Sequence, residues 1–455
     1  MRIHFISIGG SVMHQLAIAL KHKGYEVSGS DDEIFEPALG NLKAENILPP
    51  KLGWFPENIT RDLDVIILGM HAKEDNPELL KAVELKLKIY SFPEYMFEES
   101  RDKKRVALAG SHGKTTTTAM LMHVLKYANV DFDYLVGAKL AGFEQSVKIT
   151  DAPIIVCEAD EYPASTIERR PKFHFLFPHI AVITGIAWDH INVFPTFEFY
   201  LEQFSIFINK IDPHGILIYN ETDEVLQKII DRNSRKDIRY LGYHLPDFFI
   251  EDGITNVKIE GKNTPLNVFG NHNLLNLQAA YLVCKDLQID GVTFAKAISE
   301  FAGASKRLEL IAAEKTRNVY RDFAHAPSKV TASINAVRQQ FPERKLVAVL
   351  ELHTFSSLNA DFMKEYKNSM EQADEAIVFY SNHALELKRM KPLDPECVKE
   401  GFKKQELEVI NDKNLLEERL KKESADNINF LFMSSGTYDE MDILKTLNIK
   451  TQNLK

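Results

Sequence analysis

Cysteine is rare in this chain. Its 455 residues include only three, Cys157, Cys284 and Cys397, and no two of them form a CxxC pair. This spacing argues against a disulfide framework and against a typical structural zinc site, and it fits a reducing compartment. We therefore predict a cytoplasmic protein.

Long apolar runs and a positive net charge are missing as well. No uninterrupted apolar segment approaches the roughly 20 residues of a membrane span, so membrane insertion is not expected. The start, "MRIHFISIGG", is apolar but short and interrupted by glycines, which favours a first β-strand over a signal peptide. The formal net charge of -10 argues against nucleic acid as a partner, although it permits local basic sites for phosphate groups.

Strand-like and helix-like segments alternate along almost the whole chain. "RIHFISI" predicts a strand, and "MHQLAIALKHKG" predicts a helix that ends before Gly24. "DVIILGM" and "NPELLKAVELK" repeat the pair. Because this alternation is typical of parallel sheets with crossover helices, we predict an α/β fold.

The alternation falls into three segments, which we predict to be domains of residues 1–103, 104–308 and 309–455. The charged run "EESRDKKR" closes the first segment, and "VALAG" opens the second. "FAGASKRLELI" is typical of a junction, after which the third segment begins. We find no internal repeat and no low-complexity tract.

The segment "LAGSHGKTTTTAM" lies where a predicted strand gives way to a helix. Backbone N–H groups at a helix N-terminus, reached through small residues, bind phosphate. Lys114 can then reach the terminal phosphates and Thr115 can ligate Mg²⁺. Leu108 stands where the usual GxxxxGK[ST] pattern has its first glycine, so the spacing is short. A chance GKT in a surface turn is the alternative, but the strand before and the helix after favour ATP binding.

A second glycine loop, "SIGGSVM", follows the first predicted strand. Asp31 ends the next strand, 22 residues after Gly9 (31 − 9), which resembles a dinucleotide-binding pattern with an acid placed for a ribose. Ser7 and Val12 stand where that pattern has glycines. A tight turn without a ligand is therefore the alternative to nucleotide binding.

Acidic and histidine side chains follow two further apolar strands. "VCEADEY" carries Glu158, Asp160 and Glu161, and "GIAWDHINVF" carries Asp189 and His190. Each cluster alone fits a solvated loop, but ligands of open α/β sheets bind at the carboxyl ends of strands, so both clusters are expected near the phosphate loop. Phosphoryl transfer requires Mg²⁺ held by oxygen ligands. The predicted metal ligands are Thr115, Glu158 and His190.

Three more polar segments lie further along the chain. "FGNHNLLNLQAA" places His272 and Asn276 at the start of a helix, where they can contact a purine base or only cap the helix. "SKRLE" places Arg307 at the predicted junction, and "YRDFAHAP" places Asp322 and His325 at a strand end. These residues can close a domain onto a nucleotide, or they can form ordinary interdomain salt bridges.

Taken in order, "GSHGKTTT", "EADEY", "DH", "GNHNLLN", "KRLE" and "DFAHAP" resemble the muramyl ligase family. The resemblance spans roughly residues 2 to 440. It implies an α/β protein of three domains: an N-terminal Rossmann-like domain for a UDP-sugar, a central P-loop ATPase-like domain with a mostly parallel sheet, and a C-terminal Rossmann-like domain for the acceptor amine. This layout explains why the phosphate loop lies a hundred residues into the chain.

The resemblance also implies a reaction. ATP and Mg²⁺ convert the carboxylate of UDP-N-acetylmuramate into an acyl phosphate, which the amine of an acceptor attacks. The residues implied for catalysis are Lys114, Glu158, His190 and His325. Those implied for ATP are Gly110, Ser111, His112, Gly113, Lys114, Thr115, Thr116, His272, Asn276, Arg307 and Asp322. Those implied for the UDP-sugar are Gly9, Gly10, Ser11, Asp31 and His71.

Two branches of the family start from free UDP-N-acetylmuramate. One adds L-alanine, and the murein peptide ligase branch adds the tripeptide L-Ala-γ-D-Glu-meso-diaminopimelate. Tyr162 follows "EADE" where the alanine branch usually has serine, and "RRPKF" resembles a basic spacer of the peptide ligase. The resemblance therefore favours the tripeptide as acceptor, with L-alanine as the alternative.

Two readings from other classes stay open at the level of sequence. An NAD-dependent dehydrogenase could be built on the N-terminal glycine loop, but it would leave the GKT loop and the acidic clusters unexplained. A nucleotide-binding regulator without activity could retain the fold, but the presence of Lys114, Glu158 and His190 argues against it. The sequence leaves the oligomeric state and the group that accepts the amine's proton open.

Overall fold

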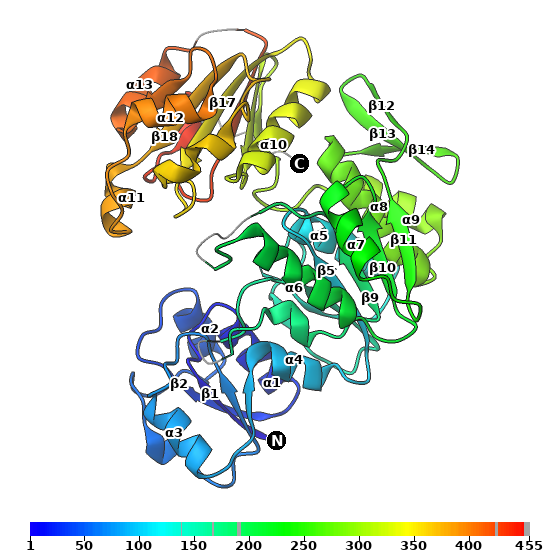
Figure 1. The fold of residues 1–455 in the computed structure, drawn as a ribbon, viewed down its shortest axis with the longest axis vertical. Coiled ribbons are helices and arrows are strands. Elements are labelled where there is room, and N and C mark those ends of the chain that lie inside the picture. Colours follow the sequence, from blue (N-terminus) through cyan, green and yellow to red (C-terminus); the bar gives the residue numbers. More distant parts are fainter. Residues whose placement is uncertain (138, 166–167, 189–192, 424–425, 450–455) are drawn as a thin grey trace. The chain divides into compact units, whose positions relative to one another are not determined.

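The computed structural model describes residues 1–137, 139–165, 168–188, 193–423 and 426–449. It has the predicted three-domain α/β architecture, with a parallel or mostly parallel sheet in each domain (Figure 1). By internal packing the chain divides into two units. The first unit comprises residues 1–186, 198–244 and 279–289, and the second comprises residues 187–197, 245–278 and 290–455. The predicted domain boundaries stay predictions.

The N-terminal sheet has the strand order β2-β1-β3-β4, and all its pairings are parallel. Helix α3 begins after Asn76, whose side chain accepts hydrogen bonds from two backbone N–H groups of the first turn. The strands and helices predicted in this region are confirmed. Its elements are β1 (Arg2–Ile6), α1 (Met13–His22), β2 (Glu26–Ser30), α2 (Ala38–Ala44), the 3₁₀ helix η1 (Pro56–Asn58), β3 (Val65–Leu68), α3 (Pro77–Glu84), β4 (Ile89–Ser91) and α4 (Phe92–Glu99).

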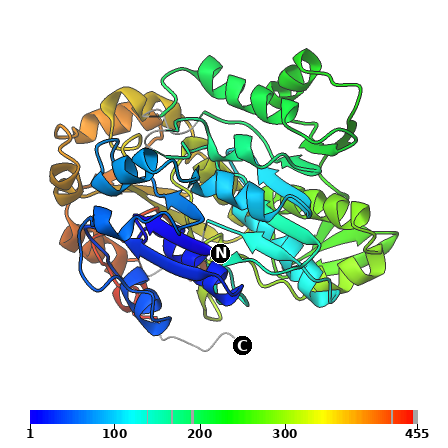
Figure 2. The ribbon, with the colours of Figure 1, turned by 90° about the horizontal axis from the view of Figure 1, so that it is seen from below.

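The central sheet has the order β11-β10-β9-β5-β8-β6-β7, and only the short β7 runs antiparallel to its neighbour. Figures 1 and 2 show α6 and α7 on one face of this sheet. Its elements are β5 (Lys104–Ala109), α5 (Lys114–Tyr127), β6 (Asp133–Leu135), β7 (Val147–Lys148), β8 (Ile154–Glu158), η2 (Lys172–Phe175), β9 (Ile180–Ile183), α6 (Phe197–Asn209), β10 (Ile216–Asn220), α7 (Glu224–Arg232) and β11 (Arg239–Tyr243).

A small antiparallel sheet of β12 (Phe248–Glu251), β13 (Ile254–Ile259) and β14 (Lys262–Leu266) follows, and then α8 (Asn271–Asp286) and α9 (Gly291–Ser299). The amide of Gln340 connects this sheet to the C-terminal domain. It accepts a hydrogen bond from Thr255 Oγ1 at 2.8 Å and donates one to the Gly253 carbonyl at 2.6 Å.

The C-terminal sheet has the order β15-β16-β20-β17-β18-β19, and only β15 is antiparallel. Buried apolar side chains cover both of its faces, in two separate clusters. Its elements are β15 (Glu309–Ala313), β16 (Arg317–Asp322), α10 (Pro327–Gln340), β17 (Lys345–Leu352), η3 (Ala360–Tyr366), β18 (Glu375–Tyr380), α11 (Asn382–Leu387), α12 (Pro395–Phe402), β19 (Glu408–Ile410), α13 (Lys413–Lys421), β20 (Ile428–Met433) and α14 (Ile443–Thr446).

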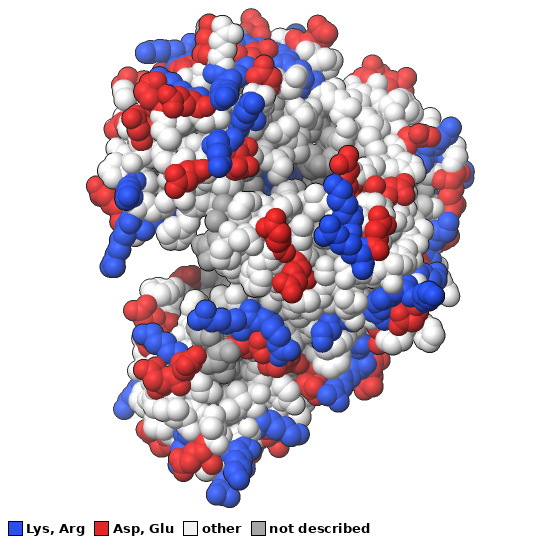
Figure 3. All heavy atoms as spheres, in the orientation of Figure 1, with Lys and Arg blue, Asp and Glu red and all other residues white. Residues whose placement is uncertain are grey.

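Charged side chains of both signs are interspersed on the face that Figure 3 shows. This distribution agrees with the modest net charge of the chain. None of the helices in the described ranges has both the length and the apolar character to cross a bilayer.

Candidate active site

The phosphate loop connects β5 to α5, as the sequence predicts. Gly110 has a φ of +127° and Gly113 a φ of +76°, conformations that L side chains rarely adopt. A side chain at Gly110 would also collide with Thr184, which follows the neighbouring strand β9. Ser111 N donates to the Gly185 carbonyl at 2.9 Å, and Thr184 Oγ1 donates to the His112 carbonyl. Thr184 and Gly185, which follow β9, therefore hold the backbone of the phosphate loop in place.

Helix α5 opens with Lys114, and Gly113 at its N-cap supplies no side-chain hydrogen bond. The first N–H groups of a helix need external acceptors, and together with the helix dipole they favour an anion. Thr115 and Thr116 belong to this first turn, and Thr116 is buried. The geometry of the loop therefore fits a phosphate group at the start of α5.

The ammonium group of Lys114 lies against a buried carboxylate. Its Nζ donates to Glu161 Oε2 and to the Gly110 carbonyl, both at 2.6 Å. Burial alone would lower the pKa of Lys114, but the carboxylates of Glu161, Asp160 and Glu158 outweigh burial and raise it. Lys114 therefore stays charged at neutral pH, as a phosphate-binding lysine must.

Glu158 ends β8 beside the phosphate loop, where its two carboxylate oxygens have different partners. Thr115 Oγ1 donates to Oε1 at 2.6 Å, and the backbone N–H of Gly137 donates to Oε2 at 3.1 Å. A hydroxyl and a carboxylate in contact are the ligand pair that holds Mg²⁺ beside bound phosphates. These two predicted ligands come together, and they fit the ion.

The third predicted metal ligand, His190, lies outside the described residues, as does Asp189. Within the ranges that the structure describes, no group of three or more His, Cys, Asp or Glu side chains is arranged to hold a metal ion.

The sequence did not single out two residues, Glu161 and Tyr200, that contact side chains of the phosphate loop. Glu161 appeared only as one acid of a cluster, and nothing local in "FEFYLEQF" singled out Tyr200. In the structure the Tyr200 hydroxyl lies 2.8 Å from Ser111 Oγ and donates to Glu161 Oε1 at 3.3 Å. Both side chains are almost completely buried.

The residues predicted for the purine and for domain closure lie in the second unit. Asn276 is buried on α8, and Asp322 is buried at the end of β16, where its carboxylate accepts from Ser333 Oγ. Burial lowers the pKa of His272, and the negative charge of Asp322 offsets only part of this effect. The Arg307 guanidinium lies over the Phe323 ring, 4.9 Å from its centroid.

His325 follows β16, and a hydrogen bond of its imidazole ring determines which ring nitrogen carries the proton. Its Nδ1 lies 2.9 Å from the Phe323 carbonyl, which can only accept. In the neutral ring Nδ1 therefore carries the proton and Nε2 has a lone pair. The tautomer suits a base, although no contact here tests that role.

The predicted UDP-sugar residues gather at the carboxyl edge of the N-terminal sheet. Gly9, Gly10 and Ser11 follow β1, Asp31 follows β2, and His71 follows β3. Gly9 N donates to Asp31 Oδ2 at 2.6 Å, so the acid placed for a ribose also holds the glycine loop. The structure therefore brings these residues together, and their role with a UDP-sugar stays a prediction.

Two buried hydroxyls at the same edge support a polar ligand there. Ser7 and Ser30 are each 1% exposed, and neither hydroxyl has a hydrogen-bond partner among the described residues. Ser30 also lines a cavity of about 220 Å³, together with Pro50, Lys51 and Phe55. Since buried polar groups are nearly always paired, such hydroxyls suggest an external partner.

Asp31 should make the stability of the protein depend on pH. Burial raises the pKa of Asp31 to about 6. The hydrogen bond from the N–H of Gly9 lowers this pKa, and the neighbouring Asp32 raises it. A carboxyl with a raised folded-state pKa contributes stability that is present below its unfolded pKa of 3.8 and is lost as the pH rises through about 6. Ionised Asp31 therefore lowers the stability of the folded protein at pH 8.

We accordingly expect Asp31→Asn to melt at a higher temperature than the wild type at pH 8 in the absence of ligand. The difference should narrow by roughly half at pH 5, where wild-type Asp31 is largely protonated in the folded state. Thermal melts of both proteins at the two pH values measure it. A difference that is independent of pH would contradict the assigned titration.

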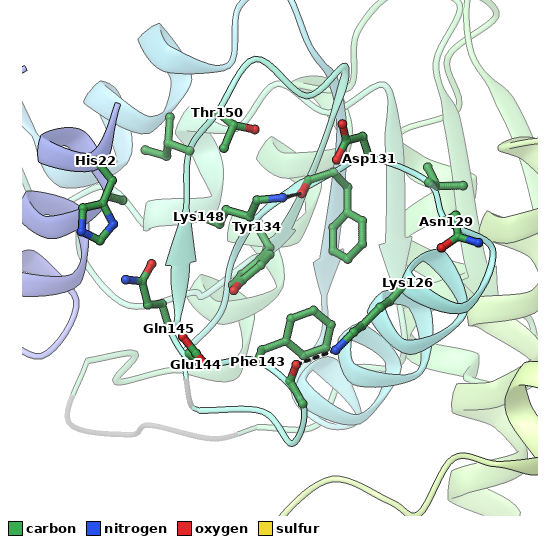
Figure 4. Close-up of a pocket in the computed structure, with 15 residues that line it drawn as sticks. His22, Lys126, Asn129, Asp131, Tyr134, Phe143, Glu144, Gln145, Lys148 and Thr150 are labelled. Carbon is green, nitrogen blue, oxygen red and sulfur yellow. Dashed lines mark hydrogen bonds between the residues drawn. The ribbon is translucent and has the colours of Figure 1, made fainter. Parts of the chain in front are cut away.

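A large cavity lies away from these residues. It has a volume of about 740 Å³ and is lined by Lys126, Tyr134, Phe143 and Lys148, among others (Figure 4). Lys126 and Lys114 lie near opposite ends of α5, about 18 Å apart along a helix that rises about 1.5 Å per residue. We therefore place the candidate site at the phosphate loop and not in this cavity.

Comparison with known families gives three matches that follow one another along the chain. A Mur ligase family catalytic domain matches residues 2–104, a Mur ligase middle domain matches residues 108–284, and a Mur ligase glutamate ligase domain matches residues 306–436. The phosphate loop, Glu158 and Glu161 lie within the middle match.

Among characterised relatives, the chain is 34% identical to the UDP-N-acetylmuramate–L-alanine ligase of Caldicellulosiruptor bescii over 386 residues, which cover 82% of each chain. It is 30% identical to the enzyme of the same name from Aquifex aeolicus, over 81% of this chain and 82% of that one.

Solved structures extend the similarity to both branches. The murein peptide ligase of Psychrobacter arcticus is 21% identical with a TM-score of 0.63, over 99% of this chain and all of that one. The UDP-N-acetylmuramate–alanine ligase of Thermotoga maritima is 23% identical with a TM-score of 0.66, over 98% and 97%. The UDP-N-acetylmuramate:L-alanyl-γ-D-glutamyl-meso-diaminopimelate ligase of Neisseria meningitidis is 27% identical with a TM-score of 0.58, over 66% and 98%.

Proposed function

Because the chain belongs to the Mur ligase family, an ATP-dependent family of ligases, we propose that it joins L-alanine to UDP-N-acetylmuramate. One observation carries the choice of acceptor: relatives 30–34% identical over about four-fifths of both chains are L-alanine ligases. This similarity supports the L-alanine alternative better than the tripeptide that the local motifs favour. Membership of the family also argues against the two alternatives from other classes, an NAD-dependent dehydrogenase and a nucleotide-binding regulator without activity.

The reaction needs an activated carboxyl group, because a carboxylate is a poor acyl donor. The carboxylate of UDP-N-acetylmuramate attacks the γ-phosphorus of ATP, and ADP leaves. Lys114, at the start of α5, neutralises charge on the transferring phosphoryl group. The amine of the acceptor then attacks the acyl carbon, phosphate leaves, and the amine loses a proton.

Thr115 and Glu158 are the residues that would hold Mg²⁺, because their oxygens already touch at 2.6 Å. When bound, the ion would supply positive charge that offsets the negative charge of the phosphates. His190 stays a predicted ligand. Gly137, whose N–H orients Glu158, would keep one carboxylate oxygen turned toward Thr115.

The N-terminal domain would bind the UDP-sugar at the carboxyl edge of its sheet. The unpartnered hydroxyls of Ser7 and Ser30 and the glycine loop at Gly9 supply donors and a close backbone approach. In the C-terminal domain, the tautomer of His325 suits removal of the acceptor's proton.

A tripeptide acceptor is the second candidate. The 27% identity to the Neisseria meningitidis ligase supports it, although that similarity covers 66% of this chain. The motifs "EADEY" and "RRPKF" favour the same branch.

An assay of phosphate release decides between the two acceptors. With ATP, Mg²⁺ and UDP-N-acetylmuramate, we expect kcat/KM for L-alanine to exceed that for the tripeptide at least about tenfold, or about 1.4 kcal/mol of transition-state binding. Reactions without acceptor and without the UDP-sugar are the controls. A preference for the tripeptide would move the enzyme to the murein peptide ligase branch, and no turnover with either would contradict the proposed function.

A further inference from the structure

A connected set of hydrogen bonds joins Lys114 and Ser111 of the phosphate loop to Glu161 and Tyr200. Lys114 Nζ donates to Glu161 Oε2 at 2.6 Å, and the other oxygen of this carboxylate accepts from the Tyr200 hydroxyl at 3.3 Å. That hydroxyl also lies 2.8 Å from Ser111 Oγ, within the loop itself. The contacts therefore join the functional lysine to its own loop through two residues outside it.

Three members of this set, Tyr200, Glu161 and Ser111, are shielded from water, whereas Lys114 is partly exposed. Tyr200 is fully buried, Glu161 is 1% exposed and Ser111 is 5% exposed. Hydrogen bonds in such a low-dielectric setting are stronger than in water, and breaking one leaves an unpaired buried group. The set is therefore costly to rearrange.

The ring of Tyr200 is fixed by aromatic packing. Its centroid lies 5.2 Å from that of Phe204, and the Phe204 centroid lies 5.5 Å from that of Phe173, both in edge-to-face geometry. Phe204 and Phe173 are themselves completely buried. The hydroxyl of Tyr200 therefore has a fixed position from which it can orient Glu161.

We propose that Glu161 and Tyr200 are positioning residues for Lys114, which fix its ammonium group for the terminal phosphate of ATP. The inference rests on the proposed function. Glu161 anchors the ammonium from the protein side, and Tyr200 orients the carboxylate and ties it to Ser111. An ammonium group has three donors, and two are directed to Glu161 and Gly110, so the geometry leaves one for a phosphate oxygen.

The contact between Lys114 and Glu161 is an ion pair, with Nζ 2.6 Å from Oε2. Replacing Glu161 with glutamine keeps a hydrogen-bond acceptor but removes the charge that anchors the ammonium group.

The test compares Glu161→Gln and Tyr200→Phe with the wild type in steady-state kinetics and in ATP binding by calorimetry without acceptor. We expect each variant to lower kcat/KM for ATP about tenfold or more, with KM for UDP-N-acetylmuramate unchanged. Tyr134→Phe, which removes a hydroxyl from another buried tyrosine, is the control and should match the wild type.

Wild-type kcat/KM for ATP in Tyr200→Phe or in Glu161→Gln would overturn the proposal while leaving the proposed function intact. Failure of the wild type to bind ATP would instead overturn the proposed function and this inference with it. Tyr200→Phe keeps the packed ring, so it should fold even if Glu161→Gln does not. Melting temperatures of both variants check this.

Discussion

Lys114→Ala is expected to lower ATP-dependent phosphate release by about a thousandfold or more. The ammonium group of Lys114 is held at the phosphate loop by Glu161 and the Gly110 carbonyl. Removal of a charge that stabilises a transferring phosphoryl group has effects of this size. The loss should appear mainly in kcat, because developing charge is stabilised more than the ground state.

Lys126→Ala is the matched control for this variant. Lys126 belongs to the same helix, is exposed, and donates to the Gly142 carbonyl far from the phosphate loop. Both variants should melt within a few degrees of the wild type. Near-normal phosphate release by Lys114→Ala would contradict the assignment of the loop.

Glu158→Gln is expected to reduce kcat about a hundredfold and to raise the Mg²⁺ concentration needed for half-maximal rate. Glutamine has nearly the same shape, but Mg²⁺ requires charged or strongly polar oxygens, and altering one ligand or its support commonly weakens a metal site 10- to 100-fold. The amide also has only one acceptor oxygen for Thr115 Oγ1 and Gly137 N, so one of them loses its partner.

A Mg²⁺ titration of the phosphate-release rate measures this effect. Glu144→Gln is the control, since Glu144 is an exposed loop residue that lines the separate cavity beside Lys126. If Glu158→Gln titrates with Mg²⁺ as the wild type does and turns over at the same rate, Glu158 has only a structural role.

Local sequence predicted the elements and the order of the functional segments well. The glycines of the phosphate loop mark a turn that requires positive φ, and the observed values of +127° and +76° agree with that reading. Gly24 and the alternating apolar runs likewise marked helix and strand ends that the structure confirms. Such signals are readable because they depend on neighbouring residues.

The choice of acceptor was less readable. Short motifs around Tyr162 favoured the tripeptide, whereas similarity over about four-fifths of the chain favours L-alanine. Specificity is a difference between affinities, set by a few contacts in a pocket assembled from separate segments. A local motif therefore weighs less than the whole-chain comparison.

The sequence by itself determined the α/β class, the phosphate loop with Lys114 and Thr115, and the acids at the end of the strand that follows. Only the tertiary structure decided which residue each of those acids contacts. Thr115 meets Glu158 across 43 residues, Lys114 meets Glu161 across 47, and Ser111 meets Tyr200 across 89. These pairs form because the strand order places β8 and β9 on either side of β5. Long-range strand pairing leaves no local signal, since it depends on burial over the whole sheet.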